Sequence, residues 1–211
     1  MLPSLRDVLT RIVLGLCALA AVGMAINSLR GSLYELRLLE LAAARAPADL
    51  VLRGLGRAAD VDPRNPEIWR LSADLSGQPE KAISDARMSL QRGPSRARTW
   101  LLLSWRLIRS GRGGDDLDRA LRQASQLAPS DRPLQLSLAM MGLQYWAIGS
   151  DVAHAVWETA IKHSLRYQPD EIKRAAAGHN LGSALCLGFV ERYDMDPWCH
   201  QQMTGSRRAS R

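Results

Sequence analysis

The sequence predicts an all-α protein in which an N-terminal transmembrane helix leads into an α-solenoid of paired helices. Three observations predict this class. Ala, Leu and Arg dominate the 211 residues while Val, Ile and Thr are sparse, and this mixture favours helix. An uncharged apolar run lies near the N-terminus. Proline markers then recur at a period typical of stacked helical hairpins.

The apolar run extends from Ile12 to Leu29 and is bracketed by Arg11 and Arg30. As a helix it would span about 27 Å, close to the minimum for crossing a bilayer. We therefore assign residues 1–30 to a membrane anchor. A cleaved signal peptide is the alternative, because Gly23-Met24-Ala25 offers small residues at the spacing that signal peptidase reads. A buried helix of a soluble protein is the third interpretation.

The orientation of this anchor rests on the segment before it. Arginines flank the run on both sides, so the positive-inside rule barely discriminates between the two orientations. The first residues are short, basic and similar to the start of a signal sequence, which favours a cytoplasmic N-terminus. The expected location is therefore the inner membrane, with a single span and the main domain in the periplasm.

Residues 31–188 are predicted to form the repeat domain, because prolines recur at positions 63, 94, 129 and 169. A proline cannot continue a helix, since it lacks the amide donor and clashes with the preceding turn. After the first of them, Asn65 is placed to cap the next helix and Pro66 suits its first turn. Trp69 and Trp100 each follow their proline marker by six residues. Each unit is therefore expected to form two antiparallel helices, and the chain then continues into the next pair.

The residues of these units resemble the tetratricopeptide-repeat (TPR) family. The unit after Pro94 matches at Trp100, Leu103, Ser104, Leu107, Leu117, Leu121, Ala124 and Pro129. The preceding unit matches at Trp69, Ala73, Ala82, Ala86, Ser89 and Pro94, and a second helix upstream matches at Val51, Leu55, Ala58 and Pro63, with Tyr34 to Ala44 as its expected partner. Leu138, Ala139, Gly142, Trp157, Ile161 and Pro169 align in a unit that is six residues too long. The alternative is an irregular α-solenoid or bundle outside this family.

The end of the solenoid is expected to be capped by a helix over Glu171–Leu187, with Gly188 as its stop. Residues 189–211 are expected to form an irregular tail, basic and disordered over its last nine residues. Cys186 and Cys199 are the candidate disulfide, which would fasten this tail to the last helix in an oxidising compartment. Two separate thiols are the alternative.

The resemblance also implies a binding surface, because first helices line the concave face of TPR solenoids. The positions carried over by the motif are Arg70, Asp74, Leu101, Trp105, Ile108, Arg109, Leu136, Met140 and Gln144. A stripe of Trp, Met and Leu framed by Arg resembles a groove for a helix or an extended peptide. The alternative places Trp105 and Met140 in the core between repeats.

No cluster of side chains predicts catalysis, a metal site or a cofactor. His154 and His163 are nine positions apart and fall on opposite faces of a helix. Asp115, Asp116 and Asp118 precede a helix, where carboxylates are favourable against its dipole. The net charge of +7 is scattered among acidic residues without an aromatic-basic strip, so a nucleic-acid partner is not expected. We therefore do not expect an enzyme.

Two functions follow as expectations. The first is a membrane-anchored scaffold that binds protein partners, themselves membrane or envelope proteins, through its concave face. The second is an accessory subunit of envelope polysaccharide synthesis or export, for exopolysaccharide or O-antigen. A short anchor followed by a small TPR-like domain resembles accessory proteins of bacterial exopolysaccharide clusters, and this likeness rests on layout alone.

Overall fold

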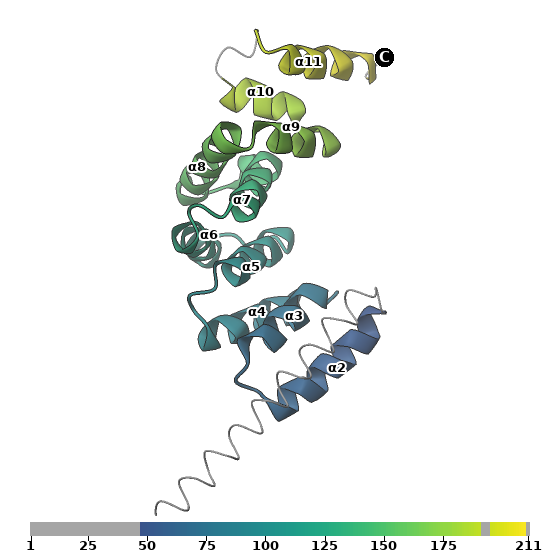
Figure 1. Ribbon diagram of the computed structural model, residues 1–211, viewed down its shortest axis with the longest axis vertical. Helices are drawn as coiled ribbons and strands as arrows, with labels where there is room; N and C mark the ends of the chain where they lie inside the picture. The colour runs from purple at the N-terminus through teal and green to yellow at the C-terminus, as the bar shows by residue number, and fades with distance from the viewer. Residues whose placement is uncertain (1–46, 191–194, 210–211) are drawn as a thin grey trace, which may run out of the picture. The chain divides into compact units, whose positions relative to one another are not determined.

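The computed structural model describes residues 47–190 and 195–209 (Figure 1). Over these ranges the chain forms ten α-helices, one short 3-10 helix and no strand, so the predicted all-α class is confirmed. The apolar run from Ile12 to Leu29 and the helix expected from Tyr34 to Ala44 lie outside the described ranges. No helix within these ranges is long and apolar enough to span a membrane. The chain divides into two compact units between Gly93 and Pro94.

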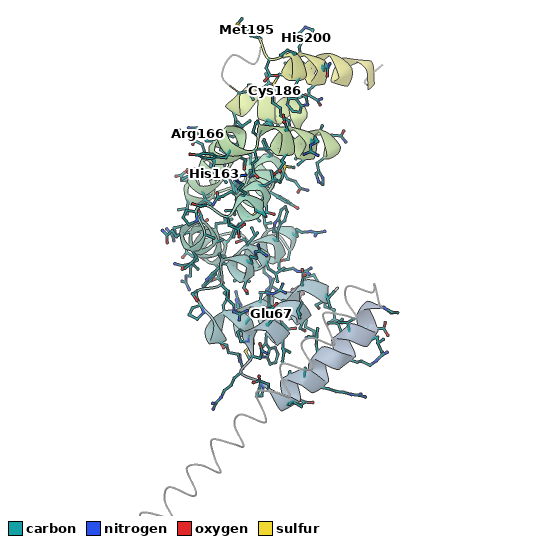
Figure 2. All side chains as sticks on the ribbon, viewed as in Figure 1. Glu67, His163, Arg166, Cys186, Met195 and His200 are labelled. Carbon is teal, nitrogen blue, oxygen red and sulfur yellow. A yellow bond between two sulfur atoms is a disulfide. The ribbon has the colours of Figure 1, made fainter. Side chains whose placement is uncertain are left out.

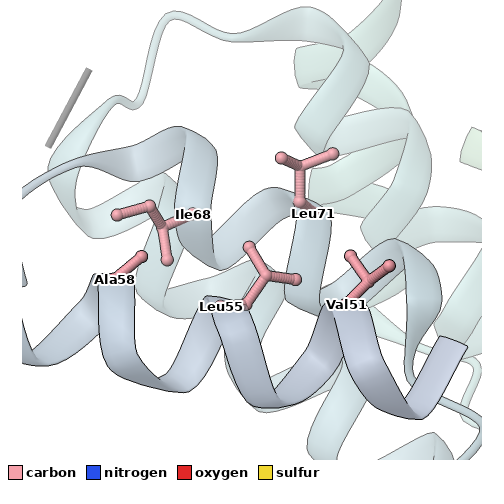
Figure 3. Close-up of a cluster of buried hydrophobic side chains, with 5 residues drawn as sticks. All are labelled: Val51, Leu55, Ala58, Ile68 and Leu71. Carbon is pink, nitrogen blue, oxygen red and sulfur yellow. The ribbon is translucent and has the colours of Figure 1, made fainter. Parts of the chain in front are cut away.

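The first unit contains α2 (Ala48–Val61), α3 (Pro66–Leu75) and α4 (Pro79–Arg92). On α2, Val51, Leu55 and Ala58 recur every three to four residues and form one apolar stripe. This stripe packs against Ile68 and Leu71 of α3 (Figure 3). The α2 residues that match the second helix of a repeat unit are therefore the ones that face the core.

The joint between α2 and α3 explains the spacing of six residues from Pro63 to Trp69. The Asn65 side chain caps α3 by accepting from the amide of Glu67 at 2.9 Å. The Pro63 carbonyl accepts from Trp69 Nε1 at 3.0 Å and from Arg92 Nε at 2.6 Å, so the end of α4 is fastened to the same point. In the second unit Trp100 Nε1 donates to the Pro94 carbonyl at 2.7 Å. At each of these two joints, the Trp side chain therefore donates a hydrogen bond to the carbonyl of the proline six residues before it.

The second unit contains three successive helical hairpins. They are α5 (Ala97–Arg109) with α6 (Asp115–Leu127), α7 (Arg132–Tyr145) with α8 (Asp151–Tyr167), and α9 (Pro169–Gly178) with α10 (Gly182–Phe189). A 3-10 helix, η1 (Trp146–Ile148), connects α7 to α8, and α11 (Pro197–Ala209) follows the last hairpin. Within this unit α7 packs beside both α5 and α9, and α8 packs beside α6. The first helices thus form one row.

The weaker match of the α7–α8 unit has a structural reason. Its extra length is taken up by η1 and by the 17 residues of α8. Gly142 of α7 lies against Trp157 of α8, a side chain that is fully buried. A Cβ atom at Gly142 would lie 2.5 Å from the Trp157 Cβ, so the two helices approach as closely as glycine allows.

The predicted capping helix over Glu171–Leu187 is wrong, because α9 ends at Gly178 and α10 begins at Gly182. Asn180 adopts the left-handed conformation with a φ of 59°. The amide of Leu181 then donates to the carbonyl of Ala176 at 2.7 Å, and that of Asn180 to the carbonyl of Ala177 at 3.1 Å. This hydrogen-bonding pattern satisfies the last carbonyls of α9 and ends the helix.

The expectation of an irregular tail from residue 189 is also wrong, since α10 continues to Phe189 and α11 covers Pro197–Ala209. The physical reason lies at the start of α11. Asp196 Oδ1 accepts from the amides of Trp198 and Cys199, and these are the donors that a new helix leaves unpaired. Cys186 and Cys199 form a disulfide with 5.6 Å between their Cα atoms, which joins α10 to α11 (Figure 2).

Candidate functional site

A hollow of about 320 Å³ lies along the row of first helices in the second unit. Trp105 of α5 forms one wall. Leu136, Ser137, Met140 and Gln144 of α7 form the middle, and Ala175 and His179 close it from α9 and its C-terminal end. Four residues of the predicted groove therefore line one cavity: Trp105, Leu136, Met140 and Gln144.

The helical repeat explains why these α7 residues share a face. Leu136, Met140 and Gln144 follow at four-residue steps and lie one above another along the helix. Their neighbours Leu138 and Met141 are fully buried on the other side of α7. The helix therefore separates a core stripe from a stripe that borders the hollow.

Trp105 and Met140 are partly exposed, which separates them from the core side chains on the same helices. The Trp105 ring packs edge-on against Tyr145 with 6.1 Å between ring centroids. This contact holds the indole in place while the rest of it borders the hollow. Both residues are therefore less buried than Leu138 and Met141, and Trp105→Ala distinguishes a binding role from a role in the core between repeats.

The prediction that Ile108 contributes to the groove surface is wrong, because its side chain is only 4% exposed. Each residue turns the helix by 100°, so Ile108 falls in line with Ser104, which is also buried. Arg109, one turn beyond Trp105, is exposed, and Leu101 is half-buried. The motif therefore places α5 beside the hollow but assigns the buried Ile108 to the groove surface.

Arg70 and Asp74 belong to α3 in the first unit, so the hollow is formed without them. Their four-residue spacing puts them on one face of α3. Arg70 Nε donates to Glu67 Oε1 at 2.7 Å, and Asp74 is exposed.

A second hollow, of about 690 Å³, was missed by the sequence reasoning. It lies between the α7–α8 hairpin and α10, lined by Leu143, Trp146, Glu158, Lys162, Ala184, Leu187, Gly188, Phe189 and Val190. Trp146 stacks on His154 at 4.5 Å and meets Phe189 edge-on at 5.2 Å. The hollow was not predicted, because a single capping helix was expected to stop at Gly188. In the structure, Gly188 and Phe189 form part of the wall of the hollow.

His154, His163 and Asp118 have structural contacts. His154 Nε2 donates to the carbonyl of Trp146 at 2.8 Å, and the His163 ring packs on Tyr167 at 4.7 Å (Figure 2 labels His163). Asp118 accepts from the hydroxyl of Ser150, the residue that caps α8. In the described part of the chain, no group of three or more His, Cys, Asp or Glu side chains is arranged to hold a metal ion.

No family model matches the chain, and no curated protein matches its sequence. Membership of the TPR family therefore stays a prediction from the repeated residues.

Proposed function

We propose that the chain is a membrane-anchored scaffold of TPR-like hairpins that holds a protein partner along α5, α7 and α9. The observation that carries this proposal is the hollow, where four residues of the predicted groove meet at one largely apolar depression. A partly exposed Trp beside Met and Leu is the kind of surface that receives an apolar anchor of a peptide or helix.

The predicted anchor would determine where in the cell the repeat domain meets its partners. If Ile12–Leu29 spans the inner membrane, the repeat domain is held close to the bilayer, and its partners are membrane or envelope proteins. Tethering would favour such partners through a high effective concentration. The alternative, an accessory role in polysaccharide synthesis or export, is a proposal from the layout of the segments, and identifying the captured partner distinguishes the two.

The substitution Trp105→Ala tests the proposed surface. We expect capture of partner proteins from solubilised membranes to fall by about tenfold or more, as for an aromatic anchor at the centre of an interface. The melting temperature should fall by only a few degrees, because the indole is only partly buried. Leu187→Ala is the matched control: it removes a 57% exposed apolar side chain from the second hollow and should leave capture unchanged.

A different result would assign Trp105 to the core. If the substitution lowers the unfolding free energy by about 3–5 kcal/mol, as expected for a fully buried Trp, the residue acts in folding and the proposal loses its main support. Equal losses of capture for Trp105→Ala and Leu187→Ala would also count against this surface.

A further inference from the structure

The first helices of the second unit lie in segments of unusual charge. Residues 97–114, 132–150 and 172–190 contain seven Arg and Lys residues and not one Asp or Glu. Among the described residues of this unit, the acidic ones instead occur at the starts of helices and on α6 and α8, which pack as the second helices of their hairpins. Lys173 is paired with Asp196, so the positive charge that accompanies the row bordering the hollow comes from the arginines.

Three of these cations fall on the same helix faces as the residues of the hollow. Arg109 lies one turn after Trp105, and Arg98 lies two turns before it. Arg132 lies one turn before Leu136. All three side chains are exposed, so their charge reaches the solvent in front of the hollow.

The opposing charges on this face are few. Asp131 meets Arg98 at 3.5 Å in an exposed pair, and Glu171 lies one turn before Ala175 on α9. Both carboxylates belong to the N-terminal ends of their helices. The opposite end of the row carries Arg109, Gln144 and His179, and the carboxylates that follow Arg109 in the chain, Asp115 and Asp116, start α6 in the other layer of that hairpin.

From this arrangement we infer that the partner presents an acidic segment with an apolar side chain; the inference rests on the proposed function. The apolar side chain enters the hollow between Trp105 and Met140, whose volume is at the lower end for ligand cavities and suits a single large side chain. Carboxylates beside it face Arg109 at the C-terminal end of the row. Charge complementarity of this kind raises the association rate and excludes basic partners.

The test compares two synthetic amphipathic peptides binding to the full-length protein in detergent. Both have the same Leu and Phe positions, while their polar positions are all Glu in one and all Lys in the other. In fluorescence anisotropy we expect the Glu peptide to bind at least about tenfold more tightly than the Lys peptide, with the difference shrinking at high salt because exposed charges are screened.

Single substitutions identify which side chains cause the preference for the Glu peptide. Arg109→Glu should weaken binding of the Glu peptide about five- to tenfold, since a like charge then faces it. Arg122→Glu is the matched control: it makes the same charge change on an exposed residue of α6 and should leave binding within about twofold. Trp105→Ala should weaken both peptides together, because it removes the apolar contact alone.

The possible results distinguish failure of the charge preference from failure of the proposed binding surface. If the two peptides bind equally and both depend on Trp105, the surface binds peptides but the charge preference is overturned. Tighter binding of the Lys peptide, binding of neither peptide, or equally tight binding of a single-stranded oligonucleotide also overturns it. Loss of capture from membranes with Trp105→Ala would still support the proposed function in each of these cases.

Discussion

Asp196 shows how one side chain starts a helix and docks it. Its Oδ1 accepts from the amide of Trp198 at 2.9 Å, and its Oδ2 accepts from Lys173 Nζ of α9 at 2.7 Å. The Lys173 ammonium also lies 5.5 Å from the Trp198 ring centroid. The hydrogen bond from Lys173, opposed by burial and aided by the amides of Cys199 and Trp198, lowers the pKa of Asp196 from its ordinary value of 3.8.

This lowered pKa predicts a pH dependence with a definite sign. A carboxyl whose folded pKa lies below its unfolded value stabilises the fold above the unfolded pKa, and that stabilisation is lost as pH falls through the folded pKa. Asp196→Asn keeps a capping oxygen but removes the charge. We expect the variant to have a lower denaturant midpoint at pH 7 and the two proteins to converge well below about pH 4.

The measurement is a series of denaturant titrations of both proteins from pH 7 to pH 3. A midpoint difference that stays constant over this range would mean that the contribution of Asp196 does not depend on its charge.

Among helices, the close approach of α7 and α8 leaves no room for a side chain at position 142. Ala at position 142 would place a Cβ 2.5 Å from the Trp157 Cβ and 2.8 Å from its Cγ, and both of these atoms are held close to the α8 backbone. We expect Gly142→Ala to destabilise the protein by about 1–3 kcal/mol, although Ala is favoured over Gly in a helix by up to about 1 kcal/mol.

Gly178→Ala provides the control in the same unit, because a Cβ there meets nothing within 4 Å. Its unfolding free energy should be unchanged or slightly raised. Equal stability of the two variants in chemical denaturation would show that α7 and α8 can separate without cost.

The helices that the sequence predicted best are those whose ends carry short-range chemistry. Asn65 and Pro66 start α3 through one cap and one fixed φ angle, both visible in the sequence. The end of α9 was missed, because the left-handed Asn180 lies in a run that continues the helical pattern. The start of α11 was missed because Lys173, which binds Asp196, is 23 residues away in the chain.

The groove shows the same division between local pattern and packing. The resemblance to the TPR motif placed Trp105, Leu136, Met140 and Gln144 on the first helices, and these four side chains line one hollow. The burial of Ile108 could have been inferred from its spacing, because it follows the motif residue Ser104 by about one turn on the same helix face. The second hollow depends on the break between α9 and α10, and no single helical pattern encodes it.

For the molecule as a whole, the disulfide supports the proposed periplasmic location. Cys186 and Cys199 are both fully buried and are separated by 13 positions. Closing a loop of this size contributes about 3 kcal/mol by the chain-entropy estimate. Such a bond persists in an oxidising compartment, and the periplasm, where we propose that the domain lies, is one.

We therefore expect protein alkylated in cells without reduction to carry no label on Cys186 or Cys199. Reduction should lower the unfolding free energy by up to about 3 kcal/mol and speed hydrogen exchange in α11. Full labelling of both thiols in cells would contradict the bridge and the periplasmic location together.

We propose that partners bind along α5, α7 and α9. Site-specific photo-crosslinking in cells tests it most directly, with the photoreactive residue placed at Met140 in the first hollow or, as control, at Leu187 in the second. We predict a discrete cross-linked product at Met140 that disappears when Trp105→Ala is added, and none at Leu187. A product at Leu187 alone, or one at Met140 that persists with Trp105→Ala, would contradict the claim.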